Sequence, residues 1–399
     1  MHKILTLNNI SVSGLNRFPR EKYEIASEIA HPDAILVRSA SMHDLEIPAS
    51  LRAVGRAGAG VNNIPVARMS ERGIPVFNAP GANANAVKEL VVAGMLLAAR
   101  NIAQGWAFAR GLEGDDGAIS KAVEAGKKQF VGFELPGRTL GVVGLGAIGV
   151  QVANVARALG MKVIGYDPTI TVQRAWQLAA DVQQALSVDD LVARSDFISF
   201  HVPLTDETRG MISAERLRHM RKGGVLLNFS RNGIIDDAAA VAALDSGHLY
   251  AYVCDFPSNL LKDHPRVVTL PHLGASTREA EENCAVMVAD QVRAWLEDGN
   301  VTNSVNFPEI QLPRNPGAGT YRLAVVNSNV PNMVGQISTD LAAAGLNIID
   351  MLNRSRGDIA VTLMDLDQWV PQETVVKLRD IPGVLSVRCL GCDQEREGA

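Results

Sequence analysis

Short apolar runs alternate with helix-compatible stretches through the middle of the chain. Each run is preceded by helix-compatible sequence, and the runs are 140–143, 161–166, 197–201, 225–228, 251–254 and 267–270. Strands that are apolar on both faces and separated by helices form a parallel sheet covered on both sides. We therefore expect a doubly wound α/β domain over residues 100–281.

The first hundred residues repeat this alternation on a smaller scale, with expected strands at 4–7, 34–37, 53–56 and 75–77. The helical pattern 86–101 carries few charges, which predicts burial between larger bodies. A second long helix is expected at 281–297. We expect a second α/β domain built from 1–99 and 282–305, with a small ligand in a cleft between the two lobes.

The carboxyl-terminal part begins with a stretch rich in proline and glycine, 306–319, which reads as a linker. Residues 320–399 then follow the order strand, helix, strand, strand, helix, strand. This order predicts a ferredoxin-like βαββαβ module, a fold that hosts many functions.

The composition narrows the class of function. A net charge of −5 and no long basic run argue against nucleic-acid or membrane-surface partners. Four cysteines are too few for a disulfide framework, and Cys389 and Cys392 form a lone C-x-x-C that is read as incidental thiols rather than a metal or redox site. With no signal peptide or membrane span in the pattern, we expect a cytoplasmic protein without metal.

The stretch GVVGLGAIG places three glycines where a strand ends and a helix begins. Gly144 would permit the tight turn, Gly146 the approach of a pyrophosphate, and Gly149 close helix–strand packing. Asp167 ends the next expected strand, where a carboxylate accepts hydrogen bonds from ribose hydroxyls and repels a 2′-phosphate. The pattern predicts NAD; the alternative is a simple glycine turn with a solvated Asp167.

Hydride transfer to a nicotinamide needs an acid/base and a cation near the reacting carbon. Arg231 in FSRNGIID and His272 in LPHLGAST both follow apolar strands, at the carboxyl edge where open α/β sheets bind ligands. We expect the two side chains on neighbouring strand tips, facing the nicotinamide. A lone histidine is more often structural, but His272 alone among the eight precedes a small-residue turn.

The sequence resembles the D-isomer-specific 2-hydroxyacid dehydrogenase family over nearly its whole length. The resemblance is carried by the motifs GRTLGVVGLGAIG, FSRNGIID, LPHLGAST, ELVVAGMLLAARN, VGRAGAGVNNIPV and GIPVFNAPGAN. The segment VNSNVPNMVGQIS looks like the opening of an ACT regulatory domain. The resemblance implies NAD-dependent oxidation of 3-phosphoglycerate to 3-phosphohydroxypyruvate, the first step of serine biosynthesis.

The resemblance also implies roles for single residues. Arg231 would grip the substrate carboxylate and C2 oxygen, and His272 would take the hydroxyl proton. The implied substrate contacts are Arg38 and Arg56 toward the phosphate, the backbone N–H groups of Ala57, Gly58, Ala59 and Gly60, and Asn83. The implied cofactor contacts are Gly144, Gly146, Ala147, Ile148, Gly149, Asp167, Pro203, Thr208, Phe229, Ser230, Arg231, Asp255, His272 and Gly274. For Arg38, Arg56 and Asn83 an ordinary surface role is the alternative.

One position departs from the family pattern. The family pairs its histidine with a glutamate, and here Asn259 stands at about that place. A carboxylate stabilises an imidazolium, whereas an amide can orient the ring but supplies no charge. The two hypotheses are that Asn259 orients His272, or that Asp263 serves from a shifted loop.

In the ACT-like module, Asn329 and Asn347 match the family's serine-binding asparagines, and Asn327 stands where a histidine is often found. Asparagine is also a routine turn former, so serine control is one of two interpretations. Serine would bind between two such modules and bias domain closure. The resemblance therefore implies a homo-oligomer, a dimer or tetramer.

Two alternative functions stay open. A hydroxypyruvate or glyoxylate reductase, or a reductase of other 2-keto acids, would need no phosphate site. An NAD-sensing scaffold with little turnover would explain the missing glutamate, although Arg231 and His272 are both present.

Overall fold

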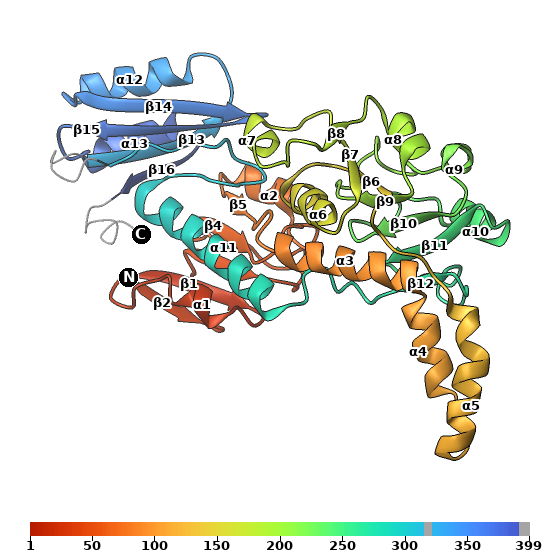
Figure 1. The fold of residues 1–399 in the computed structure, drawn as a ribbon. Coiled ribbons are helices and arrows are strands. Elements are labelled where there is room, and N and C mark those ends of the chain that lie inside the picture. Colours follow the sequence, from red (N-terminus) through yellow and green to blue (C-terminus); the bar gives the residue numbers. More distant parts are fainter. Residues whose placement is uncertain (315–320, 391–399) are drawn as a thin grey trace. The chain divides into compact units, whose positions relative to one another are not determined.

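The computed structural model describes residues 1–314 and 321–390, which divide into two compact units (Figure 1). Unit 1 consists of residues 1–82 together with the chain from residue 281 onward, and unit 2 is the continuous segment 83–280. The chain therefore leaves unit 1 at 82/83, earlier than the expected boundary at 99/100. It returns at 280/281.

Unit 2 contains a seven-stranded parallel sheet of order β12-β11-β10-β9-β6-β7-β8. Its strands are β6 (Thr139–Val143), β7 (Lys162–Tyr166), β8 (Gln183–Gln184), β9 (Phe197–Phe200), β10 (Gly224–Asn228), β11 (Leu249–Cys254) and β12 (Val267–Thr269). Its helices are α3 (Ala84–Arg100), α4 (Ile102–Arg110), α5 (Asp116–Gly126), the 3-10 turn η1 (Lys127–Phe130), α6 (Ala147–Ala158), α7 (Val172–Ala175), α8 (Val188–Arg194), α9 (Ala214–His219) and α10 (Asp237–Asp245). The strand order reverses between β6 and β9, which makes this the switch point where such sheets bind ligands.

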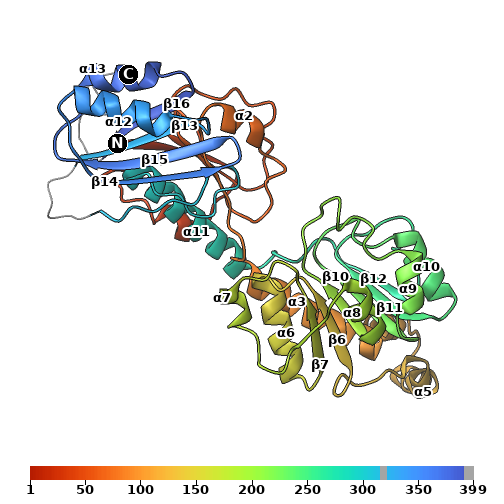
Figure 2. The same ribbon diagram turned by 90° about the horizontal axis from the view of Figure 1, so that it is seen from above.

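Both faces of this sheet are covered, which confirms the doubly wound prediction (Figure 2). Helices α3 and α6 pack on one face, with Met95 and Val152 in the same apolar cluster as Leu227. Helices α8, α9 and α10 pack on the other, where Leu191 contributes to a cluster with Ile198. The expectation that a helix precedes every strand is wrong for β12, because residues 255–266, all of them described, form turns.

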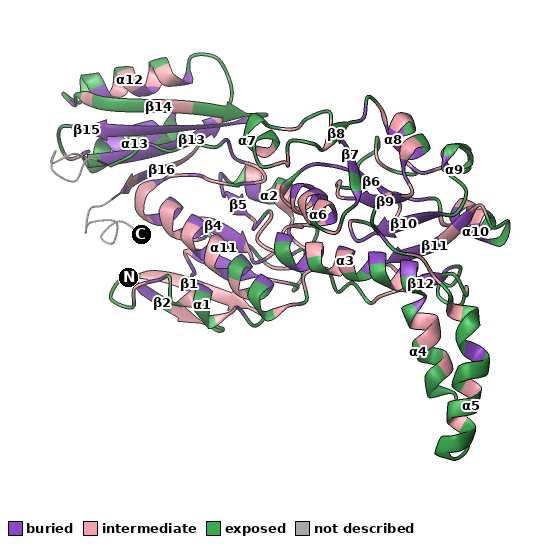
Figure 3. Cartoon of the chain, in the orientation of Figure 1, coloured by how far each residue is buried: buried purple, intermediate pink, exposed green. Residues whose placement is uncertain are grey.

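Helix α3 belongs to unit 2, where it packs on α6, β10 and β11. Beyond it, α4 and α5 project from the rest of unit 2 as a pair (Figures 1 and 3). Helix α4 has no buried residue, and Trp106 on it is 62% exposed. The sequence pattern did not reveal this pair, because neither helix buries an apolar stripe in the core.

Unit 1 contains a five-stranded parallel sheet of order β2-β1-β3-β4-β5. Its elements are β1 (His2–Leu7), α1 (Val12–Leu15), β2 (Tyr23–Ala26), β3 (Ala34–Val37), β4 (Ala53–Arg56), α2 (Val66–Glu71) and β5 (Val76–Phe77). The long helix α11 (Arg278–Asp298) crosses one face, and a Cβ at Gly55 in β4 would lie 2.7 Å from Val288 and 2.9 Å from Val292. That close approach fixes α11 over the ends of β3 and β4.

The carboxyl-terminal part forms a four-stranded antiparallel sheet of order β14-β15-β13-β16, which confirms the βαββαβ prediction. Its elements are β13 (Tyr321–Ser328), α12 (Met333–Ala343), β14 (Ile348–Arg356), β15 (Ile359–Leu366), α13 (Gln372–Asp380) and β16 (Val384–Leu390). Leu323 and Val325 face helices α12 and α13, whereas Ala324 and Val326 face α11. Strand β13 is therefore buried on both sides, whereas β14 at the edge of the sheet has no buried residue.

The segment expected as a linker is part of the core of unit 1. Phe307, Ile310 and Leu312 are 0%, 1% and 5% exposed, and their neighbours include Trp295 of α11. Val301 and Ile310 pair as an antiparallel bridge. The prolines suggested a free connector, but the apolar residues between them anchor it; residues 315–319 lie outside the described part of the chain.

Candidate active site

The glycine loop follows β6 at the switch point of the unit 2 sheet. Gly144 has φ +89°, and a Cβ there would lie 2.6 Å from the carbonyl oxygen of His201. A Cβ at Gly149 would overlap the carbonyl oxygen of Gly144. Two of the three fingerprint glycines are therefore required by the fold itself, since backbone atoms occupy the space a side chain would need.

Gly146 is different, because no described protein atom lies within 4 Å of the place its Cβ would take. Its φ is −73°, which any residue adopts, so neither packing nor backbone conformation of the protein requires glycine here. The space faces the N-terminus of α6, which starts at Ala147 and Ile148, and helix N-termini bind phosphates through their free N–H groups. An open cradle at Gly146 fits a bound pyrophosphate.

Asp167 follows β7 and reaches back to the glycine loop. Its Oδ2 accepts a hydrogen bond from the N–H of Leu145 at 2.8 Å, and its Oδ1 accepts one from the N–H of Thr169 at 2.9 Å. The carboxylate is thus fixed beside the loop, with further lone pairs for ribose hydroxyls. Between β9 and α9, the Oγ1 of Thr208 donates to the carbonyl oxygen of Pro203 at 2.6 Å.

Arg231 and His272 both lie beyond the carboxyl edge of the same sheet, after β10 and β12. The expectation of neighbouring strand tips is wrong, because β11 lies between these strands. The reason is that the chain adds β10, β11 and β12 in sequence toward one edge. Asp255, directly after β11, fills the place between them.

Two buried polar side chains hold the segments that carry Arg231 and His272. Asn228 is 1% exposed; its Nδ2 donates to the carbonyl oxygen of Arg231 at 3.0 Å, and its Oδ1 accepts from the N–H of Ser230 at 3.2 Å. Asp255 is also 1% exposed and accepts from the N–H groups of Leu273 at 2.9 Å and Gly274 at 2.8 Å. Each anchor fixes the backbone next to a predicted catalytic residue.

Sequence reasoning gave Asp255 only as a cofactor contact and did not find Asn228. The sequence does contain a signal for both residues, because Asn228 ends one apolar run and Asp255 directly follows another. A polar residue at the end of a buried strand needs hydrogen-bond partners. Ser230 is held further, by a hydrogen bond from its hydroxyl to the carbonyl oxygen of Val202. Phe229, 6% exposed, packs closely against Gly94 of α3.

The His272 ring is exposed, and its residue has φ +57°. In the described chain, neither Asn259 nor Asp263 forms a hydrogen bond with this ring, and Asp263 lies 3.8 Å from the Nζ of Lys262. The ring instead lies edge-on to Phe256, with centroids 5.2 Å apart. The structure therefore shows no contact that supports either Asn259 or Asp263 as the replacement for the family's glutamate.

In unit 1, Arg38 directly follows β3, and Arg56 is the last residue of the adjacent strand β4. The Nε of Arg56 donates to the carbonyl oxygen of Arg38 at 3.0 Å, and its guanidinium lies over Gly58. The Nη2 of Arg38 forms an ion pair with the Oε1 of Glu281 at 2.6 Å. Sequence reasoning missed Glu281, which only tertiary structure brings next to Arg38.

The glycine loop after β4 is partly engaged already. The N–H of Ala57 donates to the carbonyl oxygen of Val37 and the N–H of Gly58 to that of Arg56, both at 2.8 Å. Within the described chain, only the N–H groups of Ala59 and Gly60 in this loop make no hydrogen bond. They are the two free to bind an anion, where the sequence suggested four.

Asn83, at the start of unit 2, precedes α3 and has a buried Oδ1 without a hydrogen-bond partner in the described chain. A buried acceptor of this kind calls for a donor from elsewhere.

The three asparagines of the carboxyl-terminal module do not meet within one copy. Asn327 is buried in β13 and donates to the carbonyl oxygen of Ser328. Asn329 follows β13 and Asn347 precedes β14; both strands pair antiparallel to β15, next to its opposite ends. At about 3.4 Å per strand residue they lie roughly 30 Å apart, so one small ligand could touch both only across two copies.

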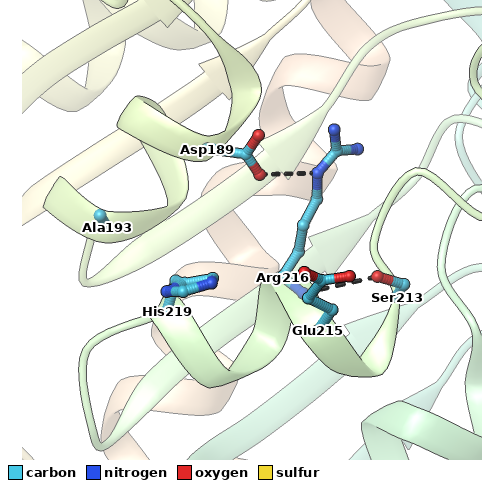
Figure 4. Close-up of a pocket in the computed structure, with 6 residues that line it drawn as sticks. All are labelled: Asp189, Ala193, Ser213, Glu215, Arg216 and His219. Atoms are coloured by element: carbon cyan, nitrogen blue, oxygen red, sulfur yellow. Dashed lines mark hydrogen bonds and ion pairs between the residues drawn. The ribbon is translucent and has the colours of Figure 1, made fainter.

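Other features of the described residues lie apart from these groups. A hollow of about 510 Å³ on unit 2 is lined by residues of α8 and α9, including Asp189 and His219, and by Ser213, which precedes α9 (Figure 4). It contains none of the predicted site residues. No cluster of three metal-ligating side chains occurs among the described residues, and no described helix is long and apolar enough to cross a membrane.

Comparison with known proteins agrees with this geometry. The model of the D-isomer-specific 2-hydroxyacid dehydrogenase NAD-binding domain matches residues 92–274. D-3-phosphoglycerate dehydrogenase of Mycobacterium bovis is 33% identical over 406 residues, covering 94% of this chain and 74% of that protein. This chain belongs to the D-isomer-specific 2-hydroxyacid dehydrogenase family. Its NAD-binding domain is therefore that of the family.

Other relatives in the family agree. D-3-phosphoglycerate dehydrogenase of Methanocaldococcus jannaschii is 36% identical over 354 residues, 86% of this chain and 64% of that protein. The NAD+-bound 3-phosphoglycerate dehydrogenase of Entamoeba histolytica matches the structure with a TM-score of 0.59 and 26% identity, over 76% of this chain and 98% of that one. This chain spans 50% to 64% of the length of the first curated relatives it matches.

Proposed function

We propose that this chain catalyses the NAD-dependent oxidation of 3-phosphoglycerate to 3-phosphohydroxypyruvate. The observation that carries the proposal is the pair of buried anchors, Asn228 and Asp255, which hold the segments of Arg231 and His272 at one sheet edge. Two arginines on adjacent strands of unit 1 supply cations for a phosphate. The D-3-phosphoglycerate dehydrogenase relatives support this substrate.

In the proposed reaction, NAD+ would supply the acceptor for the hydride that leaves C2 of the substrate. His272 takes the proton of the C2 hydroxyl, and Arg231 binds the C2 oxygen and carboxylate and stabilises the charge that develops there. Asp255 fixes the backbone that follows His272, and Asn228 fixes that of Arg231. Asp167 would hold the ribose and disfavour a 2′-phosphate, which selects NAD over NADP.

At the other end of the substrate, Arg38 and Arg56 would bind the phosphate, since arginine presents paired donors to phosphate oxygens. The free N–H groups of Ala59 and Gly60 would bind the carboxylate. Asn83 would contact the substrate through its buried, unpaired Oδ1.

The test is an assay with purified protein, 3-phosphoglycerate and NAD+, followed by the absorbance of reduced cofactor. Turnover is expected, with loss in His272→Asn. Glyoxylate or hydroxypyruvate with NADH is the control reaction. Turnover of these acids without turnover of 3-phosphoglycerate would overturn the proposal, and binding of NAD without any turnover would indicate a sensing scaffold.

Reduction of unphosphorylated 2-keto acids is the second candidate. One observation favours it: Glu281 neutralises Arg38, so half of the proposed phosphate site carries no net charge in this structure. The two candidates differ in the ratio of kcat/KM for phosphorylated and unphosphorylated acids.

We also propose that the chain acts in the cytoplasm as a homo-oligomer regulated by L-serine. The projecting pair α4 and α5 exposes Ile102 and Trp106, at 46% and 62%, and a second copy could cover them. Serine would bridge Asn329 of one module and Asn347 of another. Serine titration of the activity and the mass of the assembly in solution test these two points.

A further inference from the structure

A carboxylate of this chain lies against one of the two cations proposed to bind phosphate. The Nη2 of Arg38 donates to the Oε1 of Glu281 at 2.6 Å, and the two side chains are 39% and 43% exposed. Arg38 is therefore reachable from solvent, but its charge is already paired. Sequence spacing alone separates these residues by more than half the chain.

Packing holds Glu281 at this place. It lies in the first turns of α11, and Cys284 and Val288, one and two turns further on the same helix face, are 4% and 0% exposed. Both belong to the apolar cluster that contains Leu36 of β3 and Ala53 of β4. The helix face that is buried on the sheet thus delivers Glu281 to the edge where Arg38 and Arg56 emerge.

The charges decide what such a site can bind. Arg38 and Glu281 together carry no net charge, so an anion reaches the charge of Arg38 only by exchanging with Glu281. An exposed ion pair contributes little to stability, so an incoming anion can exchange with Glu281. A doubly charged phosphate monoester offers twice the charge of the carboxylate and paired acceptor oxygens, whereas a singly charged group offers no advantage over Glu281.

We propose that Glu281 is the resident counter-ion of this anion site, and that it selects a doubly charged phosphate monoester against singly charged or neutral groups. The substrate named here rests on the proposed function. The anion selectivity itself can be measured without turnover.

The selectivity should depend on pH. The second ionisation of a phosphate monoester has a pKa near 6, so the dianion predominates above this pH and the monoanion below it. Phosphate affinity of the natural chain is expected to fall as pH drops from 7.5 to about 5.5. Without Glu281 the monoanion meets no competing carboxylate, and the fall becomes shallower.

The experiment compares Glu281→Gln with Glu279→Gln, which removes the same charge from an exposed position two residues earlier in α11. Binding of inorganic phosphate and of acetate to the full chain is measured by calorimetry at pH 7.5 and 5.5. Glu281→Gln is expected to bind phosphate about fivefold tighter and to gain acetate binding, while Glu279→Gln matches the natural chain. Equal gains in both variants, or none in Glu281→Gln, overturn the proposal.

Glu281→Asp gives a second test should the amide variant fold poorly, because the shorter side chain keeps the charge but loses reach to Arg38. It is expected to tighten phosphate binding by a smaller factor. Turnover separates the two proposals. If 3-phosphoglycerate is not oxidised but phosphate binding responds to Glu281, the substrate is wrong and the counter-ion stands; if it is oxidised with unchanged phosphate binding in both variants, only the counter-ion fails.

Discussion

The carboxyl edges of the two parallel sheets present their functional groups in different ways. In unit 2, the segments of Arg231 and His272 are held by Asn228 and Asp255, both 1% exposed and both bonded to backbone groups. In unit 1, Arg38 is held by an ion pair with Glu281 in which both partners are partly exposed.

The difference follows from the two proposed tasks, which are catalysis in unit 2 and binding of a charged group in unit 1. Chemistry needs atoms at fixed positions, which buried hydrogen bonds to backbone supply, because a broken one leaves an unpaired group out of water. Binding a charged group needs a partner that can leave, which an exposed ion pair supplies. Two predictions test this contrast directly, and two more test how unit 2 builds its sheet edge.

The largest effect is expected where the chemistry lies. His272→Asn should lower kcat by about a hundred- to ten-thousand-fold with little change in KM, because it removes the proton acceptor. Arg38→Ala should mainly raise KM for the phosphorylated substrate, because it removes a binding group. Steady-state kinetics of both variants checks this prediction. Similar losses of kcat in the two variants would contradict the division into a catalytic role for His272 and a binding role for Arg38.

The anchors should differ in stability. Asp255→Ala leaves the N–H groups of Leu273 and Gly274 without an acceptor, the second of them buried, and should lower the free energy of unfolding by about 2–4 kcal/mol. Glu281→Ala breaks an exposed pair and should change it by less than about 1 kcal/mol. Urea unfolding at neutral pH measures both. Comparable values for the two variants would contradict the assignment of buried and exchangeable anchors.

Two glycines of the loop after β6 test separately what the fold requires and what the cofactor requires. Gly146→Ala adds a methyl group to open space, so stability should hold while the Kd for NAD rises by about tenfold or more. Gly149→Ala forces a clash with the Gly144 carbonyl and should destabilise unit 2 by about 1–3 kcal/mol. Calorimetric NAD titration and thermal unfolding distinguish the two variants. Unchanged NAD binding in Gly146→Ala would contradict the proposal that this loop binds the pyrophosphate.

The smallest effect concerns pH. Burial lowers the pKa of His201, next to the glycine loop, to about 3. Its unfolded pKa is near 6.5, so this residue contributes stability at neutral pH that is lost as pH falls from 6.5 toward 3, by about 1.4 kcal/mol per pH unit. In His201→Gln the dependence of unfolding free energy on pH between 6.5 and 5 should be shallower by this amount, and an identical slope would show that the ring is not buried neutral.

The apolar runs of unit 2 were enough to predict its parallel strands, because strands buried on both faces leave a pattern that few other structures share. The projecting helices α4 and α5 left no such pattern, since within the described chain α4 buries no residue and α5 buries only Gly126. Residues 306–319 were expected from their prolines and glycines to form a linker, but Phe307, Ile310 and Leu312 are buried in the core of unit 1.

At the proposed site, Arg231, His272 and the three loop glycines were predicted from short motifs, in which neighbours in sequence are neighbours in space, and their roles stay predictions. The insertion of β11 between β10 and β12 could not, because strand order is set by how the whole sheet assembles. The sequence also could not predict that the N–H groups of Ala57 and Gly58 bond to backbone carbonyls. In the described chain this leaves only the N–H groups of Ala59 and Gly60 in the loop after β4 without a hydrogen bond.

The sequence by itself determined which residue types stand at strand ends, because local pattern and short motifs are properties of adjacent positions. Tertiary structure decided which charge faces which: the Arg38–Glu281 pair joins residues 243 positions apart, and it exists because α11 packs its apolar face across β3 and β4. Charge pairing acts through space, and only the folded chain sets those distances.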